Sequence, residues 1–164
     1  MLGTKIFTIS LLFALAGFGA WPDYFPLQPG NQWIYRCTGP CAAEPQVVEI
    51  AKWDVFDGKL YWLLKGFHGR ETWLRMEDDG TLSAYDPESK RESRWYSFFA
   101  SEGETFGTSV DPCSPVASIA SNRTTYAGPV GEYGHALSVV YRPGGCADAG
   151  LSREFFLPWI GLVH

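Results

Sequence analysis

Apolar and polar residues alternate along most of the chain with the period of two that is typical of β-strands. In residues 70–76, Thr72, Leu74 and Met76 share one face, and the charged or aromatic residues between them share the other. Turn-forming pairs separate such segments, and the Asp-Gly pair at 57–58 predicts a tight hairpin. Apart from the N-terminal apolar run, no segment shows the sustained apolar spacing of an amphipathic helix.

This alternation predicts an all-β domain, an antiparallel meander of about 8–10 short strands that forms a barrel, a half-barrel or a sandwich. The predicted strands cover residues 32–37, 46–56, 60–67, 70–76, 81–85, 92–99, 105–110, 123–127, 136–142 and 152–157. Residues 100–121 form a looser stretch rich in Gly, Ser and Pro, in which we expect one short strand at most.

The N-terminus has the pattern of a secretory signal peptide. Lys5 precedes an apolar run at residues 6–16, and small residues follow that run. Cleavage after Gly19 places small residues at the two positions that a signal peptidase requires, and cleavage after Ala16 fits equally well.

These features divide the chain into a signal peptide at 1–19 and a single all-β domain at 20–164, exported to the periplasm or the cell exterior. The apolar run is too short to cross about 30 Å of hydrocarbon comfortably, so we expect no membrane span after cleavage. Phe18 stands where a lipoprotein would have its cysteine, which argues against a lipid anchor. The abrupt end after an apolar segment leaves open a continuation in a longer parent protein.

The net charge bears on the choice of partner. The chain has 13 Lys and Arg against 18 Asp and Glu, a formal net charge of −5. Removal of Lys5 with the signal peptide leaves 12 against 18, a net charge of −6. Nucleic acids and anionic membranes bind basic surfaces, so we expect neither as the main partner. The aromatic content of 16% favours a β-rich core.

An even number of cysteines in an exported chain predicts two disulfides, for which three pairings exist. We favour Cys37–Cys41, which closes a tight turn, and Cys113–Cys146, which joins two loops rich in Pro and Gly. A zinc site is the alternative interpretation. Zinc knuckles usually contain two closely spaced pairs, however, and only the first pair is close here.

Three stretches together resemble exported bacterial proteins of unassigned function. Residues 24–35, YFPLQPGNQWIY, resemble an opening YFPLxxGNxWxY motif, and parts of residues 79–106 resemble the middle of those proteins. Residues 158–163, PWIGLV, resemble a closing PGxGLV motif, although Trp159 stands where that motif has glycine. The resemblance implies a bacterial, exported, antiparallel β domain, and it brings no catalytic residues.

No motif predicts catalysis, a cofactor or a metal. The chain has no Gly-x-Ser-x-Gly elbow, and its three histidines are isolated. The acidic run at 77–79 is interpreted as a hairpin turn because Gly80 follows it. Trp33 and Tyr35 share one face of the first predicted strand, where they either close one end of the core or face a ligand.

The favoured function is an exported, non-catalytic interaction or structural module in the periplasm or at the cell surface, with an unknown protein or envelope component as its partner. The first alternative is a carrier of a small apolar ligand in a barrel cavity. The second is a hydrolase with a site assembled from distant residues, so an enzyme is the less favoured interpretation. A filled interior favours the module, an open apolar cavity the carrier, and a carboxylate or histidine cluster in a cleft the hydrolase.

Overall fold

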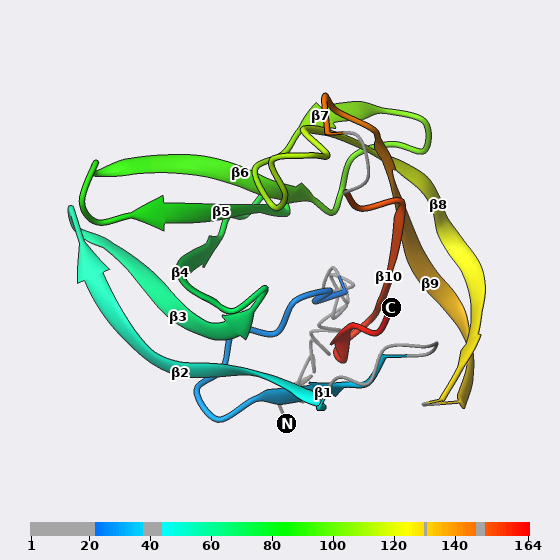
Figure 1. The fold of residues 1–164 in the computed structure, drawn as a ribbon, viewed down its shortest axis with the longest axis horizontal. Helices are drawn as coiled ribbons and strands as arrows, with labels where there is room; N and C mark the ends of the chain where they lie inside the picture. The colour runs from blue at the N-terminus through cyan, green and yellow to red at the C-terminus, as the bar shows by residue number, and fades with distance from the viewer. Residues whose placement is uncertain (1–21, 38–43, 130, 147–149) are drawn as a thin grey trace, which may run out of the picture.

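The computed structural model describes residues 22–37, 44–129, 131–146 and 150–164 (Figure 1). These residues form eleven strands and no helix, which confirms the predicted all-β fold. The strands are β1 (Gln32–Tyr35), β2 (Gln46–Phe56), β3 (Lys59–Phe67), β4 (Arg70–Met76), β5 (Thr81–Asp86), β6 (Arg91–Ser97), β7 (Thr105–Gly107), β8 (Val116–Gly128), β9 (Gly131–Arg142), β10 (Arg153–Leu157) and β11 (Gly161–Leu162). The described part of the chain has no helix that is long and apolar enough to cross a membrane.

The strands form two antiparallel sheets that follow the order of the chain. The first sheet has the order β1-β2-β3-β4-β5-β6, and the second has the order β11-β10-β9-β8-β7. The first sheet curls, so that its β2–β3 and β5–β6 turns approach each other (Figure 1). The Tyr85 hydroxyl donates a hydrogen bond to Asp57 at 2.9 Å, and Lys59 pairs with Glu92 at 3.0 Å.

Two of the hairpins are explained by residues that accept a positive φ. Asp57 and Gly58 have φ values of 51° and 75°, and His68 and Gly69 have values of 50° and 69°. Two consecutive positive φ values are characteristic of the type I′ turn, whose twist matches that of the flanking strands. The Asp-Gly and His-Gly pairs therefore fix the registers of β2–β3 and β3–β4 locally.

Hydrogen bonds join the two sheets at both of their lateral edges. On one side, the Thr108 hydroxyl, just after β7, donates to the carbonyl of Trp95 in β6 at 2.6 Å. On the other side, the indole N–H of Trp33 in β1 donates to the carbonyl of Ile160, just before β11, at 2.6 Å. The sheets therefore enclose one shared interior.

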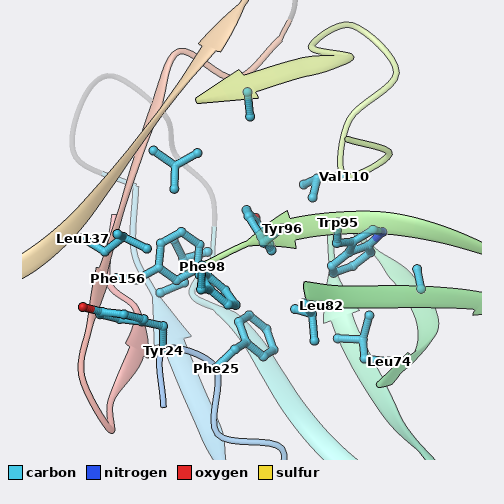
Figure 2. Close-up of a cluster of buried hydrophobic side chains, with 14 of the residues drawn as sticks. Tyr24, Phe25, Leu74, Leu82, Trp95, Tyr96, Phe98, Val110, Leu137 and Phe156 are labelled. Carbon is cyan, nitrogen blue, oxygen red and sulfur yellow. The ribbon is translucent and has the colours of Figure 1, made fainter. Parts of the chain in front are cut away.

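Aromatic rings fill much of this interior (Figure 2). The rings of Tyr96 and Phe98 stack with centroids 5.2 Å apart, and Phe156 packs on Phe98 at 5.1 Å from the second sheet. Tyr24 and Phe25, which precede β1, pack against the same cluster. Residues at alternate positions of separate predicted strands meet in this one core. Those buried in it include Leu74, Leu137, Val139 and Tyr141, and Trp33 and Tyr35 pack against it.

The second sheet differs from the prediction in the length of its central hairpin. We predicted strands at 123–127 and 136–142, whereas β8 begins at Val116 and β9 at Gly131. The pairing of β8 with β9 contains three register shifts between Ile119 and Tyr126. Each shift interrupts the alternation of apolar and polar residues, so the sequence pattern does not show the full length of these strands.

The Cys113–Cys146 disulfide is present, with an S–S distance of 2.04 Å. It joins the loop before β8 to the loop after β9, as the sequence predicted. A disulfide is compatible with an exported protein. The expected Cys37–Cys41 bond involves Cys41, which lies outside the described residues, as do the predicted signal peptide and its cleavage site.

Candidate functional site

The two aromatic residues selected from the sequence lie where β1 meets the second sheet. Trp33 is half-buried, and a Cβ atom at Gly161 would lie 2.9 Å from its indole nitrogen, so close packing there requires glycine. The Tyr35 hydroxyl donates to the carbonyl of Leu162 at 2.9 Å. Burial, followed by the nearby Glu154 carboxylate, raises the pKa of Tyr35. Both aromatic side chains thus hold the sheets together, and Trp33 also borders a surface cleft.

A buried carboxyl group lies between the two sheets. Glu154 in β10 is only 4% exposed and pairs across the sheet with Val139, on the face that packs into the core. Its Oε2 atom accepts a hydrogen bond from the Tyr96 hydroxyl of the first sheet at 2.8 Å and another from the Tyr141 hydroxyl of β9. This side chain therefore connects opposite walls of the interior.

The protonation of Glu154 is shifted by its surroundings. Burial disfavours the carboxylate and raises its pKa to about 7, although the hydroxyls of Tyr141 and Tyr96 act in the opposite direction. Burial also raises the pKa values of Tyr96 and Tyr141, and the neighbouring Glu154 adds to this effect. The group can exchange a proton near neutral pH. It lines none of the surface clefts described below, so the structure gives it no contact with a substrate.

Glu154 is not among the residues that the sequence motifs single out, although the sequence contains a signal for it. Glu154 and Phe156 occupy alternate positions of one predicted strand, so they share a face. A charged residue at a position that matches a core phenylalanine indicates a buried polar group. Its partners could not be inferred, because Tyr96 comes from a strand 58 residues earlier.

A second network lies on the face of the first sheet that points away from the shared core. The aromatic residues Tyr61, Trp73 and Tyr85 gather on this face. Glu92 accepts hydrogen bonds there from the Tyr61 hydroxyl at 2.6 Å, from Lys59 at 3.0 Å and from Arg75 at 2.8 Å. Burial acts to raise the pKa of Glu92, but these donors outweigh it and lower the pKa to about 2. Glu92 is therefore a structural anion that joins β3, β4 and β6.

Large apolar side chains are exposed along the β2–β3 hairpin. Trp53, Val55 and Leu60 are 59%, 52% and 39% exposed. Val55 pairs directly with Leu60, and Trp53 with Trp62, so all four side chains project from one face of the hairpin. We call this set the apolar hairpin surface.

An open cleft of about 270 Å³ adjoins the apolar hairpin surface at Trp62. The cleft lies between β3, β4 and the segment that precedes β1, and its lining is largely apolar: Pro22, Asp23, Tyr24, Phe25, Leu27, Gln28, Trp62, Met76, Phe98 and Phe99. Exposed apolar groups next to an apolar cleft are typical of interaction sites, because single exposed apolar residues are common but contiguous ones are not.

Glu102 and Glu104, at alternate positions of the chain, do not form a catalytic pair of carboxylates. Glu102 accepts a hydrogen bond from the backbone N–H of Asn122, and Glu104 from that of Ser101, so each carboxylate stabilises a turn or loop. No group of three or more His, Cys, Asp or Glu side chains within the described ranges could hold a metal ion.

No family model, curated protein or solved structure matches this chain. The resemblance to exported bacterial proteins therefore remains a prediction from the sequence motifs.

Proposed function

We propose that this chain is an exported, non-catalytic β domain that binds an envelope protein through the apolar hairpin surface and its adjoining cleft. The observation that carries the proposal is the row of Trp53, Val55 and Leu60, which leaves apolar area in contact with water on an otherwise well-packed domain. Exposing such area is unfavourable, and binding a partner recovers the free energy by removing it from water.

The packing of the interior favours this function over a ligand carrier. Rings from both sheets meet at the centre, with Tyr96 and Phe156 only 4.9 Å apart. Carriers need a concave pocket that encloses most of the ligand, commonly about 300–1,000 Å³ in volume. The apolar cleft next to Trp62, at about 270 Å³, lies near the lower end of this range and opens to solvent, so it suits one or two side chains of a partner.

Site-specific photocrosslinking in the exported protein tests this proposal. A photoreactive residue at position 53 or 60 should give an adduct of one defined mass, and the same residue at exposed Glu132, in β9 of the second sheet, should not. With the captured protein purified, Leu60→Asp should weaken its binding by about tenfold or more, since an unpaired charge would be buried at the contact. Leu60 is exposed, so this variant should keep the wild-type melting temperature.

The proposal fails if position 132 gives the same adduct, or if Leu60→Asp binds the purified protein as tightly as the wild type does. Saturable uptake of a fluorescent fatty acid, lost in a Trp62→Ala variant, would instead support a carrier of small apolar ligands.

A further inference from the structure

The turn between β10 and β11 holds a tryptophan in a backbone conformation that disfavours it. Trp159 has a φ of 65° and is 62% exposed. A side chain with a Cβ is strained in this left-handed region, where glycine is the usual residue. The backbone N–H of Trp159 donates to the carbonyl of Asp23 at 2.6 Å, which anchors the turn. A large ring kept in water at a strained position indicates a function for its exposed face.

Trp159 stands at the edge of a small cleft of about 150 Å³ between β1 and this turn. The cleft is lined by Pro26, Asn31, Gln32, Trp33, Trp159 and Ile160. The lining residues include one asparagine, one glutamine, two tryptophans and no charged residue; the surface that they present to the cleft is mainly polar, and the exposed Trp159 ring lies at its rim.

The side-chain amides of Asn31 and Gln32, two residues that line the cleft, each donate one hydrogen bond. The Asn31 side-chain nitrogen donates to the carbonyl of Pro26 at 3.0 Å, and that of Gln32 donates to Glu49 at 2.9 Å. Each of these bonds uses one N–H of the amide. An amide oxygen accepts hydrogen bonds, and its nitrogen carries a second hydrogen that can be donated.

We propose that this cleft binds one ring of a neutral saccharide, with a C–H face of the sugar against the Trp159 indole and its hydroxyls on the amides of Asn31 and Gln32. A sugar ring combines an apolar face with a polar rim, which matches an exposed indole beside two amides. The site is separate from the apolar hairpin surface and adds a second binding function to the proposed module.

The lining residues argue against other ligand classes. A phosphate, carboxylate or nucleotide would require a cation, but no charged residue lines the cleft. An alkyl chain could offer no hydrogen bonds to the polar surface of this cleft, which it would remove from water. A neutral ring with hydroxyl groups satisfies the indole and the amides together.

The substitution Trp159→Gly separates the structural role of this residue from its binding role. Glycine accepts a φ of 65° without strain, so the variant should melt at the wild-type temperature or above it. Its saccharide binding should weaken by about tenfold or more, which is the expected effect of removing one stacked ring. Trp159→Phe keeps an aromatic face and should retain part of the affinity.

The probes are chitotetraose and cellotetraose, titrated at millimolar concentration against uniformly ¹⁵N-labelled protein. At least one of them should shift the indole N–H signal of Trp159, which is assigned by its absence from the Trp159→Phe spectrum. Trp53→Ala is the matched control, because Trp53 is equally exposed but lies on the apolar hairpin surface.

Three results would overturn the proposal: no shift of the Trp159 signal with either sugar, unchanged binding by Trp159→Gly, or an equal loss of binding in Trp53→Ala. Trp53 and Leu60 carry the proposed protein interaction and do not line this cleft. Protein binding and saccharide binding can therefore be measured separately, and the failure of one proposal does not decide the other.

Discussion

Replacing Glu154 with glutamine should make the protein relatively more stable at high pH. The carboxyl group is almost completely buried, and its pKa rises from 4.5 to about 7 in the folded state. Below about pH 4.5 the group is protonated in both the folded and the unfolded chain and costs nothing. Between these pH values the unfolded chain is ionised and the folded one is not, so the free energy of unfolding falls as pH increases.

The magnitude follows from the size of this shift. A difference between 4.5 and about 7 corresponds to about 3 kcal/mol of stability, lost between these pH values and not regained above them. Glutamine has nearly the same shape and can still accept hydrogen bonds from Tyr96 and Tyr141, but it does not titrate. Relative to the wild type, Glu154→Gln should therefore gain about 3 kcal/mol between about pH 4 and pH 8.

Urea unfolding followed by tryptophan fluorescence measures this difference at each pH for both proteins. Other titrating groups are common to the two chains, so their contributions cancel to first order. Tyr96→Phe removes a hydroxyl whose hydrogen bond favours the carboxylate, so the pKa of Glu154 should rise further. The free energy of unfolding of this variant should therefore keep falling to a higher pH than that of the wild type. A stability difference between wild type and Glu154→Gln that does not change with pH would refute the assignment of a raised pKa to this group.

Three further substitutions test the core and the disulfide. Leu74→Ala should lower the free energy of unfolding in urea by about 2–5 kcal/mol and Val139→Ala by somewhat less, because both side chains are completely buried in a packed core. Small losses at both sites would indicate a cavity there. Cys113→Ala removes the bond to Cys146, which spans a separation of 33 residues. In the chain-entropy model this loss should destabilise the folded protein by about 3–4 kcal/mol. An unchanged melting temperature would show that the bond does not constrain the unfolded chain.

The proposed sites differ in how visible they are in the sequence. Trp53, Val55 and Leu60 fall on one face of a predicted hairpin, so their alignment could be read from the alternation and the turn at 57–58. Their exposure could not, because apolar residues at alternate positions normally indicate a buried face. Only the path of the other strands shows that this end of the hairpin extends beyond the core.

The site at Trp159 depends on tertiary structure in a different way. The proline before it indicates a turn, but a turn residue's φ is not given by its identity, and tryptophan would not be expected at 65°. The neighbouring amides of Asn31 and Gln32 come from the other end of the chain. They reach the turn because β1 lies against β11, through the hydrogen bond from Trp33 to Ile160.

The sequence by itself determined the all-β class and most of the strands of the first sheet. Those features depend on local properties: a side-chain period of two and turn residues that accept positive φ. The sequence favoured Cys113–Cys146 among three possible pairings, and the approach of two loops 33 residues apart decided it. The tertiary structure alone decided the closure of the two sheets and the position of Glu154 between Tyr96 and Tyr141. Sheet curvature and register shifts set which distant strands meet, and the residues of any single strand do not encode them.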